Sequence, residues 1–482
     1  MGASVRFVGR VRVALAIVAT TLVCAGAAAY ARPASAAAGW SSQFTIAASD
    51  GKLLACVELF PGGAPPDGGW PGVILFHGLG QTYADMEPIG DALGEFGLAS
   101  LACDARGTGA SQGQWGLDGP REVQDAQDLF DWFSGQADIS DTQIGAMGLS
   151  LGGGEVWNAA VAGVPFKAIV PAITWTNLAS ALNPNGVAKT GLVGILAQKV
   201  PLANWDPALA QTAQDLLQGN VTQAVKSTEA ARSPRSQIHA LTVPTLMLQG
   251  RHDFLFDMDQ ATAAWKLLAG PKRLYLGDLG HPPAKNPADE QAVYIGDAVI
   301  WFEHYLAGAG SAGVDNVILA HDPFDEDSGT VYKKLPKTTT ASVNLPGTTK
   351  LTGGTSFATR HVRLPGGPHE TFGDGFLTVH YSGAKNWTHL VAMVSVKDNA
   401  TPITEGAAPI KSSSGVVKIP LMNEAVLVKR GKRLTVSLGS TSADNVNQVG
   451  VPIYASPAPQ GASIKIGSVT LKLSFLKRAV SK

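Results

Sequence analysis

Between residues 44 and 308, short apolar segments alternate with amphipathic ones, and this alternation limits the folds that are open to the chain. The apolar segments are too short for helices, whereas the segments between them repeat apolar residues at helical spacing. Many strands that are each followed by a helix predict a mostly parallel sheet with helices on both faces. The predicted strands are LLACVELF, GVILFHG, ASLACDARG, IGAMGLS, KAIVPAITW, PTLMLQG and RLYLGDLG.

Two parts of the chain depart from this alternation. Residues 176–237 form a helix-rich insertion, and after about residue 310 short segments alternate apolar and polar residues, as in SVTLKLSF. Such alternation without helices predicts an antiparallel, jelly-roll-like β-sandwich. We therefore expect an α/β domain with a helical cap, then a linker, then the sandwich. The predicted bounds are 37–309 for the α/β domain, 176–237 for its cap, 310–330 for the linker and 331–482 for the sandwich.

The N-terminal 36 residues are typical of a secretory signal peptide. Arg6, Arg10 and Arg12 precede an apolar segment at 13–29, and Ala34-Ser35-Ala36 offers a cleavage site with small residues. We therefore expect the mature protein to be secreted or periplasmic. After cleavage two cysteines remain, Cys56 and Cys103. An exported protein can hold a disulfide, so a bridge and two free buried thiols are both open.

The net charge of −1 hides a strong asymmetry. Residues 37–330 carry 14 Lys/Arg and 32 Asp/Glu, which gives 14 − 32 = −18, whereas residues 331–482 carry 19 and 6, which gives 19 − 6 = +13. The simpler interpretation is that the two domains dock through complementary faces, and we favour it together with a role in solubility. The alternative is that the basic domain binds an acidic polymer of the cell envelope.

Ser150 is the candidate nucleophile. It lies in Gly148-Leu149-Ser150-Leu151-Gly152, directly after the predicted strand IGAMGLS. Glycines around a serine at the end of a strand are typical of a nucleophile elbow, a sharp strand-to-helix turn in which side chains do not fit beside the serine. A serine hydroxyl needs a base within hydrogen-bond reach, and that base needs a partner that fixes its tautomer.

The acid and the base follow at the ends of two later strands. Asp253 follows PTLMLQG, and His281 follows RLYLGDLG. The order Ser, Asp, His matches the nucleophile-elbow arrangement, and the carboxyl ends of neighbouring parallel strands meet at one edge of the sheet. Asp257 and Asp278 compete for the role of the acid, but Asp257 is placed to cap the next helix and Asp278 lies within the strand. Among the ten histidines only His281 has the right placement.

An acyl transfer also needs hydrogen-bond donors for the oxyanion. We expect the backbone N–H groups of Leu79, directly after the turn at His77-Gly78, and of Leu151, at the start of the helix after Ser150, to form this hole. His77 is interpreted as a structural turn residue. The loop 103–113 is rich in glycine, but no Gly-Lys-Ser/Thr follows it, so it is interpreted as structural rather than phosphate-binding. Trp115 and Trp175 are candidates for the pocket wall or for ordinary core packing.

With these residues in place, the chain resembles an α/β-hydrolase, and more narrowly the X-prolyl dipeptidyl-peptidase and cocaine-esterase-like serine hydrolases. The motifs are HGLG, DARGTGASQG, GLSLGG, the block ARSP…VPTLMLQGRHDF, and GDLGH. The resemblance implies a C-terminal β-domain, as predicted above. That group typically uses a tyrosine after the early strand in the oxyanion hole, but this chain has HGLGQTY, and the spacing of Tyr83 does not support that role. A dipeptidyl-peptidase must also hold a substrate ammonium, and the insertion contains only three carboxylates, Asp206, Asp215 and Glu229.

We therefore predict a secreted serine hydrolase that cleaves carboxylic esters, or amides, through an acyl-enzyme. The first alternative is an Xaa-Pro dipeptidyl-peptidase with the same triad, and the second is a non-catalytic envelope-binding protein that uses its basic C-terminal domain. The expected partners are a small-molecule ester or peptide substrate and an acidic envelope polymer, with no nucleic acid. No His/Cys/Asp cluster has the spacing of metal ligands, so we expect neither a metal nor an organic cofactor. The oligomeric state and the exact substrate are left open.

Overall fold

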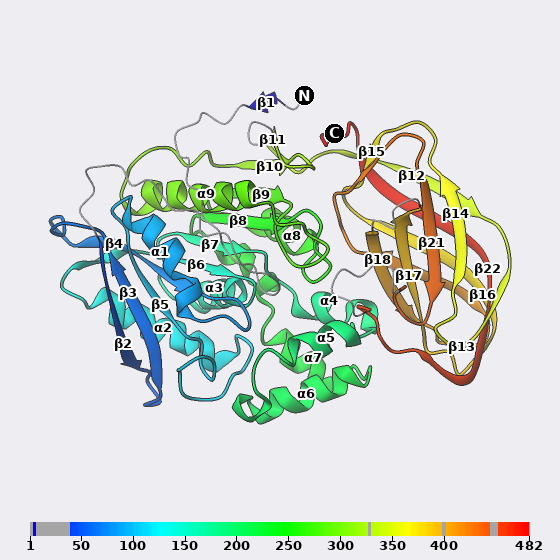
Figure 1. Ribbon diagram of the computed structural model, residues 1–482, viewed down its shortest axis with the longest axis horizontal. Helices are drawn as coiled ribbons and strands as arrows, with labels where there is room; N and C mark the ends of the chain where they lie inside the picture. Colours follow the sequence, from blue (N-terminus) through cyan, green and yellow to red (C-terminus); the bar gives the residue numbers. More distant parts are fainter. Residues whose placement is uncertain (1–2, 6–38, 326–328, 398–401, 444–451, 482) are drawn as a thin grey trace.

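The computed structural model describes residues 3–5, 39–325, 329–397, 402–443 and 452–481. An α/β domain and a β-sandwich lie side by side, and helices α4–α7 lie beneath them in the view of Figure 1. Apart from residues 3–5, the predicted signal peptide lies outside the described residues. None of the helices in the described ranges is long and apolar enough to cross a bilayer.

The α/β domain is built on an 11-stranded sheet with the order β1-β11-β10-β9-β8-β7-β6-β4-β5-β3-β2. The strands from β5 to β10 in that order pair in parallel, and antiparallel strands flank them at both edges. This arrangement confirms the predicted, mostly parallel α/β sheet. Its strands are β1 (Ala3–Val5), β2 (Trp40–Ala47), β3 (Leu53–Phe60), β4 (Trp70–Phe76), β5 (Ala99–Cys103), β6 (Ile139–Leu149), β7 (Ile169–Ala172), β8 (Thr245–Gly250), β9 (Lys272–Gly277), β10 (Asn316–Ala320) and β11 (Gly329–Tyr332).

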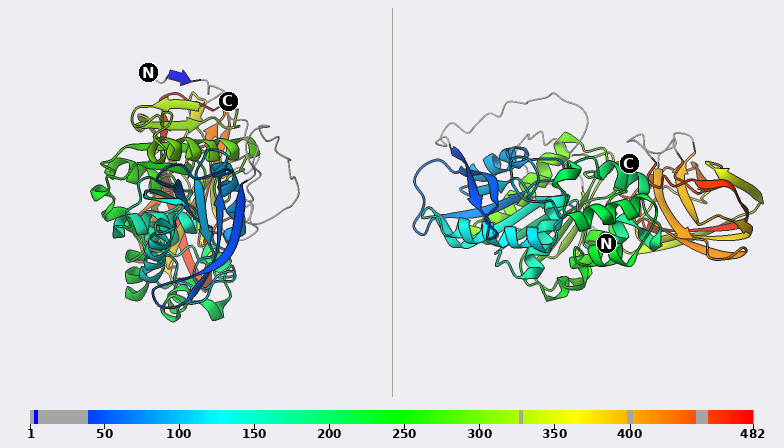
Figure 2. Two further views of the ribbon diagram at one scale, coloured as in Figure 1. Left: turned by 90° about the vertical axis from the view of Figure 1, so that its left-hand side faces the viewer. Right: turned by 90° about the horizontal axis from the view of Figure 1, so that it is seen from below.

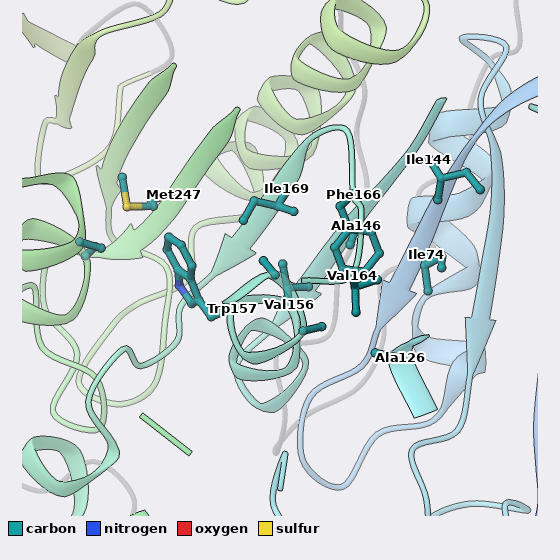
Figure 3. Close-up of a cluster of buried hydrophobic side chains, with 14 of the residues drawn as sticks. Ile74, Ala126, Ile144, Ala146, Val156, Trp157, Val164, Phe166, Ile169 and Met247 are labelled. Atoms are coloured by element: carbon teal, nitrogen blue, oxygen red, sulfur yellow. The ribbon is translucent and has the colours of Figure 1, made fainter. Parts of the chain in front are cut away.

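Helices cover both faces of this sheet, as Figure 2 shows in two further views. Helices α1 (Glu87–Gly94) and α9 (Ala288–Leu306) pack on one face, whereas α2 (Pro120–Ser134), α3 (Leu151–Ala162) and α8 (Asp259–Leu267) pack on the other. Figure 3 shows the second face, where Val156 and Trp157 of α3 lie against Ile169 and Met247 of the sheet. Both sides of the sheet are therefore buried, which explains why its strands are continuous apolar runs.

The predicted linker 310–330 differs from the structure. Within this range β10 continues the parallel sheet beside β9, and β11 turns back to pair with β10. Val317 and Leu319 are fully buried in the sheet. The prediction is wrong here because the composition changes after residue 310, whereas the segment still completes the edge of the α/β sheet.

The cap falls within the predicted insertion. Its helices are α4 (Leu178–Leu182), α5 (Thr190–Leu196), α6 (Pro207–Leu217) and α7 (Gln223–Ala230). They bury a separate apolar cluster with Leu151 and Trp175 from the α/β domain. The cap therefore closes over the end of the sheet where β6 meets α3.

The C-terminal part is an antiparallel β-sandwich, as predicted. One sheet has the order β12-β22-β16-β19, with β13 also on β22, and the other has the order β14-β21-β17-β18. In β22, Val469, Leu471, Leu473 and Phe475 are buried between the sheets, as their alternation indicates. The strands are β12 (Thr338–Leu345), β13 (Thr349–Gly354), β14 (Ala358–Arg363), β15 (His369–Glu370), β16 (Gly375–Lys385), β17 (His389–Val396), β18 (Pro402–Pro409), β19 (Gly415–Leu421), β20 (Leu427–Val428), β21 (Arg433–Gly439) and β22 (Ala458–Leu476).

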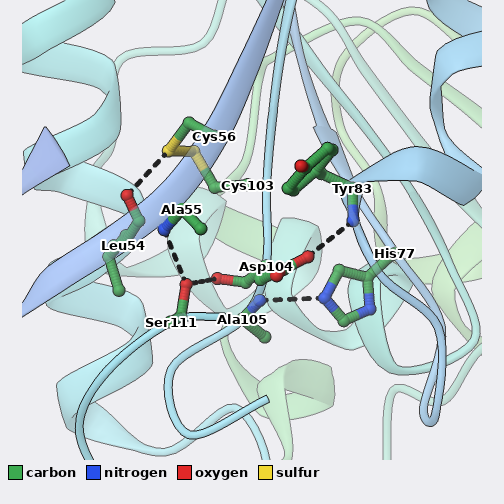
Figure 4. Close-up of a disulfide and its surroundings, with 9 residues drawn as sticks. All are labelled: Leu54, Ala55, Cys56, His77, Tyr83, Cys103, Asp104, Ala105 and Ser111. Atoms are coloured by element: carbon green, nitrogen blue, oxygen red, sulfur yellow. Dashed lines mark hydrogen bonds between the residues drawn. A yellow bond between two sulfur atoms is a disulfide. The ribbon is translucent and has the colours of Figure 1, made fainter. Parts of the chain in front are cut away.

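Of the two states left open for the cysteines, the structure has the disulfide. Cys56 of β3 and Cys103 of β5 are bonded across neighbouring antiparallel strands. Figure 4 shows this bridge next to Asp104, whose carboxylate accepts a hydrogen bond from the backbone N–H of Tyr83 at 2.8 Å. The same carboxylate also accepts from the backbone N–H of Ala110 at 2.7 Å. The glycine-rich loop 103–113 thus ties itself to the neighbouring turn through its own side chains.

Candidate active site

Ser150 lies at the turn between β6 and α3, and its backbone is strained. Its φ and ψ angles are 54° and −112°, a backbone conformation that residues other than glycine rarely adopt. The neighbouring glycines permit this turn: a Cβ on Gly148 would collide with the carbonyl of Gly152, and a Cβ on Gly152 would collide with the carbonyl of Phe76. The local sequence therefore encodes a nucleophile elbow that presents the hydroxyl above the sheet.

The structure brings Ser150, His281 and Asp253 together. The Ser150 hydroxyl lies 2.9 Å from Nε2 of His281, and Nδ1 of His281 lies 2.8 Å from Oδ2 of Asp253. In this chain of bonds Nδ1 donates to the carboxylate, which leaves Nε2 free to accept the serine proton. The three side chains come from the ends of β6, β8 and β9, so the parallel sheet gathers residues that are far apart in sequence.

Asp253 is fully buried, and four N–H groups hold its carboxylate. Oδ2 accepts from the backbone and the ring of His281, at 2.9 and 2.8 Å. Oδ1 accepts from the backbone of Leu255 and Phe256, at 2.8 and 3.0 Å. Both oxygens are therefore satisfied, and the carboxylate cannot rotate without losing hydrogen bonds.

The other acids and histidines considered from the sequence have different partners. Asp257 accepts from the backbone N–H of Asn423 at 2.9 Å, and burial raises its pKa to about 6. Asp278 pairs with Lys285 at 3.2 Å. Burial lowers the pKa of His252 to about 3, and its ring packs edge-on against Phe254. None of these contacts leads to Ser150.

The residues expected to form the oxyanion hole face the same space as Ser150. Leu79 and Leu151 line the pocket that contains the hydroxyl. Neither backbone N–H has a hydrogen-bond partner among the described residues. Both are therefore free to donate to a substrate oxygen, as an oxyanion hole requires. Tyr83 does not line this pocket, which agrees with the poor support that its spacing gave.

His77 supports the turn rather than the chemistry. Its Nε2 accepts the backbone N–H of Ala105 at 2.8 Å, and its Nδ1 lies 2.8 Å from the carbonyl of Gly78, to which it donates. Burial lowers the pKa of its imidazole, which favours this neutral form. The bond to Ala105 is visible in Figure 4, where it joins the turn to the loop beside the disulfide.

The pocket is almost entirely apolar and has a cavity volume of about 70 Å³. Trp115 and Trp175, the two candidates for its wall, both line it and are almost fully buried. The cap contributes further lining residues that the sequence did not single out, among them Val193 and Trp205. Trp205 packs edge-on against Trp115 with ring centroids 4.8 Å apart. The apolar lining suits a substrate with an apolar group.

Glu229 is the one carboxylate among the residues that line this pocket. It accepts a hydrogen bond from Nδ2 of Asn183 through Oε1, whereas Oε2 has no partner among the described residues. Burial raises its pKa to about 7. Glu229 is one of the three cap carboxylates identified in the sequence. The other two have different roles: Asp206 caps α6, and Asp215 accepts a hydrogen bond from the Thr222 hydroxyl.

Within the described ranges, no group of three or more His, Cys, Asp or Glu side chains is arranged to hold a metal ion.

Comparison with known proteins agrees with this geometry. Residues 79–283 match the family model described as X-Pro dipeptidyl-peptidase (S15 family). A curated Escherichia coli protein, the uncharacterized 31.7 kDa protein in the traX-finO intergenic region, is 33% identical over 109 residues. This alignment covers 22% of the present chain and only 38% of that protein.

Solved structures share the fold over nearly the whole chain. A CocE/NonD family hydrolase from Staphylococcus aureus has a TM-score of 0.67 at 14% identity, covering 90% of this chain and 93% of its own. An alpha-amino acid ester hydrolase has a TM-score of 0.66 at 13% identity, covering 93% and 98%. An aminopeptidase from a Thaumarchaeota archaeon has a TM-score of 0.66 at 12% identity, covering 91% and 97%. The family match covers residues 79–283, and the fold shared with these structures is an α/β-hydrolase-type core followed by a C-terminal β-domain.

Proposed function

We propose that the protein is an exported carboxylesterase that forms an acyl-enzyme on Ser150. The observation that carries this proposal is the hydrogen-bonded chain from Ser150 through His281 to Asp253, which opens onto an apolar pocket. Ser150 attacks the ester carbonyl while Nε2 of His281 takes its proton, and the N–H groups of Leu79 and Leu151 bind the oxyanion. The protonated His281 then gives its proton to the departing alcohol. Water, activated by the same imidazole, releases the acid.

The pocket favours esters over peptides with a free N-terminus. An Xaa-Pro peptide would bring an ammonium group, which needs carboxylates to replace its water shell. The lining offers only Glu229, and one of its oxygens is already bonded to Asn183. An ester with an apolar acyl or alcohol group needs no such partner and gains from burial against Trp115 and Trp175.

A panel of p-nitrophenyl esters from acetate to octanoate, assayed beside an Xaa-Pro p-nitroanilide, separates the two substrate classes. We expect ester turnover to exceed anilide turnover in kcat/KM, and Ser150→Ala to lose at least about 10⁴-fold in kcat. Ser227→Ala, on the exposed face of α7, is the matched control and should keep wild-type activity. Wild-type turnover by Ser150→Ala would refute the mechanism. Preferred cleavage of the anilide would refute the esterase assignment in favour of the peptidase.

Export is part of the proposal. The disulfide between Cys56 and Cys103 supports it, because such bonds persist in oxidising compartments. Fusion of residues 1–36 to a reporter that is active only outside the cytoplasm tests this directly. Retention of the reporter in the cytoplasm would refute it.

An acidic envelope polymer is the further partner that we propose for the C-terminal domain. Lys418 and Lys472 lie over the ring of Phe376, at 3.9 and 5.4 Å from its centroid, on the outer side of one sheet. The docking interpretation of the charge asymmetry predicts ion pairs between this basic domain and the acidic one. Among the described ion pairs, Arg251 with Glu370 is the one that joins the domains. Its cation belongs to the acidic domain and its anion to the basic one, which is the reverse of what docking by charge predicts. The lysines therefore remain available to a polyanion.

This partner is tested by binding of the full chain to wall polymers that carry phosphate or carboxylate groups. We expect retention at low salt, release at high salt, and loss of retention in the double variant Lys418→Glu, Lys472→Glu. Retention of that variant equal to wild type would refute the proposed surface.

A further inference from the structure

One loop of the β-sandwich packs along the segment that carries the triad acid. This loop, residues 422–426, connects β19 to β20, and the segment, residues 251–258, follows β8. Two backbone hydrogen bonds fasten the ends of the segment: Ala425 N–H donates to the carbonyl of Arg251 at 2.7 Å, and Met258 N–H donates to the carbonyl of Asn423 at 3.0 Å. Residues about 170 positions apart are thus paired beside the active site.

Glu424 lies at the centre of this contact. Its Oε2 accepts the backbone N–H of Asp253 at 3.0 Å, so the sandwich holds the main chain of the triad acid directly. Glu424 is 2% exposed and Asp253 is 0% exposed, so water does not compete for this bond. The backbone carbonyl of Glu424 accepts in turn from the Thr371 hydroxyl at 2.6 Å. The carboxyl group is therefore built into the sandwich and directed at the acid segment.

A buried ion pair anchors the contact. Arg251, two residues before the acid, pairs with Glu370 of β15, and both side chains are almost completely buried. Nε of Arg251 also donates to the carbonyl of Ala425 at 2.9 Å. Loss of either partner would leave an uncompensated buried charge, so the sandwich cannot separate from this segment at low cost.

The environment of Glu424 favours its neutral form. Burial, and then the neighbouring carboxylates of Asp257 and Asp253, raise its pKa well above the ordinary value, and the hydrogen bond from the Asp253 N–H and the charge of Lys189 oppose this only in part. Its Oε1 has no hydrogen-bond partner among the described residues, and an unpaired buried charge would be far more costly than an unpaired neutral group. A neutral carboxyl accepts the Asp253 N–H without adding negative charge beside the triad.

We propose that Glu424 is a positioning residue, through which the C-terminal domain fixes the backbone of Asp253 and thereby aims its carboxylate at His281. This inference rests on the proposed triad and gives the β-sandwich a part in the active site. Because Glu424 touches neither Ser150 nor the pocket in the described contacts, its removal should change kcat and leave KM nearly unchanged.

The test compares variants of the full-length enzyme. Glu424→Gln keeps a neutral acceptor and should keep kcat within about twofold of wild type, whereas Glu424→Ala leaves the Asp253 N–H buried without an acceptor and should lower kcat by about tenfold. Glu424→Leu keeps most of the volume and also removes the acceptor, so it replaces Glu424→Ala if that variant does not fold. The matched control is Glu405→Ala, which removes a buried carboxyl of the same domain that bonds Ser442 and not the acid segment.

A pH profile separates positioning from a general loss of stability. With Asp253 loosened, the imidazolium of His281 loses part of the carboxylate that stabilises it, so the acid limb of kcat/KM should move to lower pH in Glu424→Ala and Glu424→Leu. Glu405→Ala should keep the wild-type profile even where it unfolds at lower temperature.

The outcomes distinguish this inference from the proposed function. If Ser150→Ala is inactive while Glu424→Ala or Glu424→Leu keeps the wild-type kcat and pH profile, the positioning role is overturned and the triad stands. If Glu424→Gln is as impaired as Glu424→Ala, the neutral-acceptor role is overturned. If Ser150→Ala keeps full activity, the proposed function itself fails.

Discussion

Replacement of Asp253 by asparagine tests the geometry of the site most sharply. The carboxylate accepts four N–H bonds, two on each oxygen, whereas an asparagine amide has one acceptor oxygen and a donor group. If the amide oxygen faces Leu255 and Phe256, the NH₂ group meets the backbone N–H of His281 and forces Nδ1 to become an acceptor. Nε2 then carries the proton and cannot accept another from Ser150.

The size of the effect follows from this count. The wrong tautomer should lower kcat by about 10⁴-fold, the loss known for the equivalent change in other triads, and this corresponds to about 5 kcal/mol of transition-state stabilisation. One buried N–H donor, the backbone N–H of His281, also loses its acceptor, at about 1–3 kcal/mol, so the free energy of unfolding should fall by about the same amount. KM should change little, because Asp253 does not line the pocket.

The assay is steady-state hydrolysis of p-nitrophenyl butyrate well below the melting temperature of each variant, with urea unfolding measured in parallel. Asp257→Asn is the matched control, because Asp257 is a partly buried acid of the same segment whose carboxylate accepts a hydrogen bond from the backbone of Asn423. It should keep kcat within about tenfold of wild type. An Asp253→Asn enzyme within tenfold of wild type would contradict the reasoning, as would a larger loss in Asp257→Asn than in Asp253→Asn.

Three further outcomes are expected. Replacement of Cys56 and Cys103 by serine opens a loop with a sequence separation of 47 and should lower the free energy of unfolding by about 4 kcal/mol in urea titrations; no change between wild type and variant would contradict the stabilising role. Burial raises the pKa of Glu405 from 4.5 to about 7, so the folded state binds this proton more tightly than the unfolded state, and the associated stability is lost as pH rises through about 7. The unfolding free energy of Glu405→Gln should therefore decrease less between pH 5 and 8 than that of wild type. Parallel curves of unfolding free energy against pH would disprove this. Val193→Phe adds volume to the cap side of the pocket and should lower the octanoate-to-butyrate ratio of kcat/KM by about tenfold, whereas an unchanged ratio would show that the acyl chain lies elsewhere.

The sequence alone predicted the α/β sheet, the β-sandwich and the three residues that the structure brings together, because these depend on local patterns. Apolar runs define strands, glycines around Ser150 permit a strained turn, and the ends of parallel strands meet at one edge whatever the surrounding packing. The bounds of the α/β domain were predicted less well, since β10 and β11 join the sheet from a segment whose composition already resembles the next domain.

The tertiary structure decided what no local pattern encodes. The apolar pocket forms where the cap helices pack against Trp115 and Trp175, so its shape depends on contacts between segments that are distant in sequence. The bond between Glu424 and the backbone of Asp253 joins positions 171 residues apart, and in sequence Glu424 is only a rare acid in a basic domain. Local propensity acts over a few residues, whereas burial and hydrogen-bond satisfaction are settled only once distant segments meet, and for that reason the triad could be predicted from the sequence but its support could not.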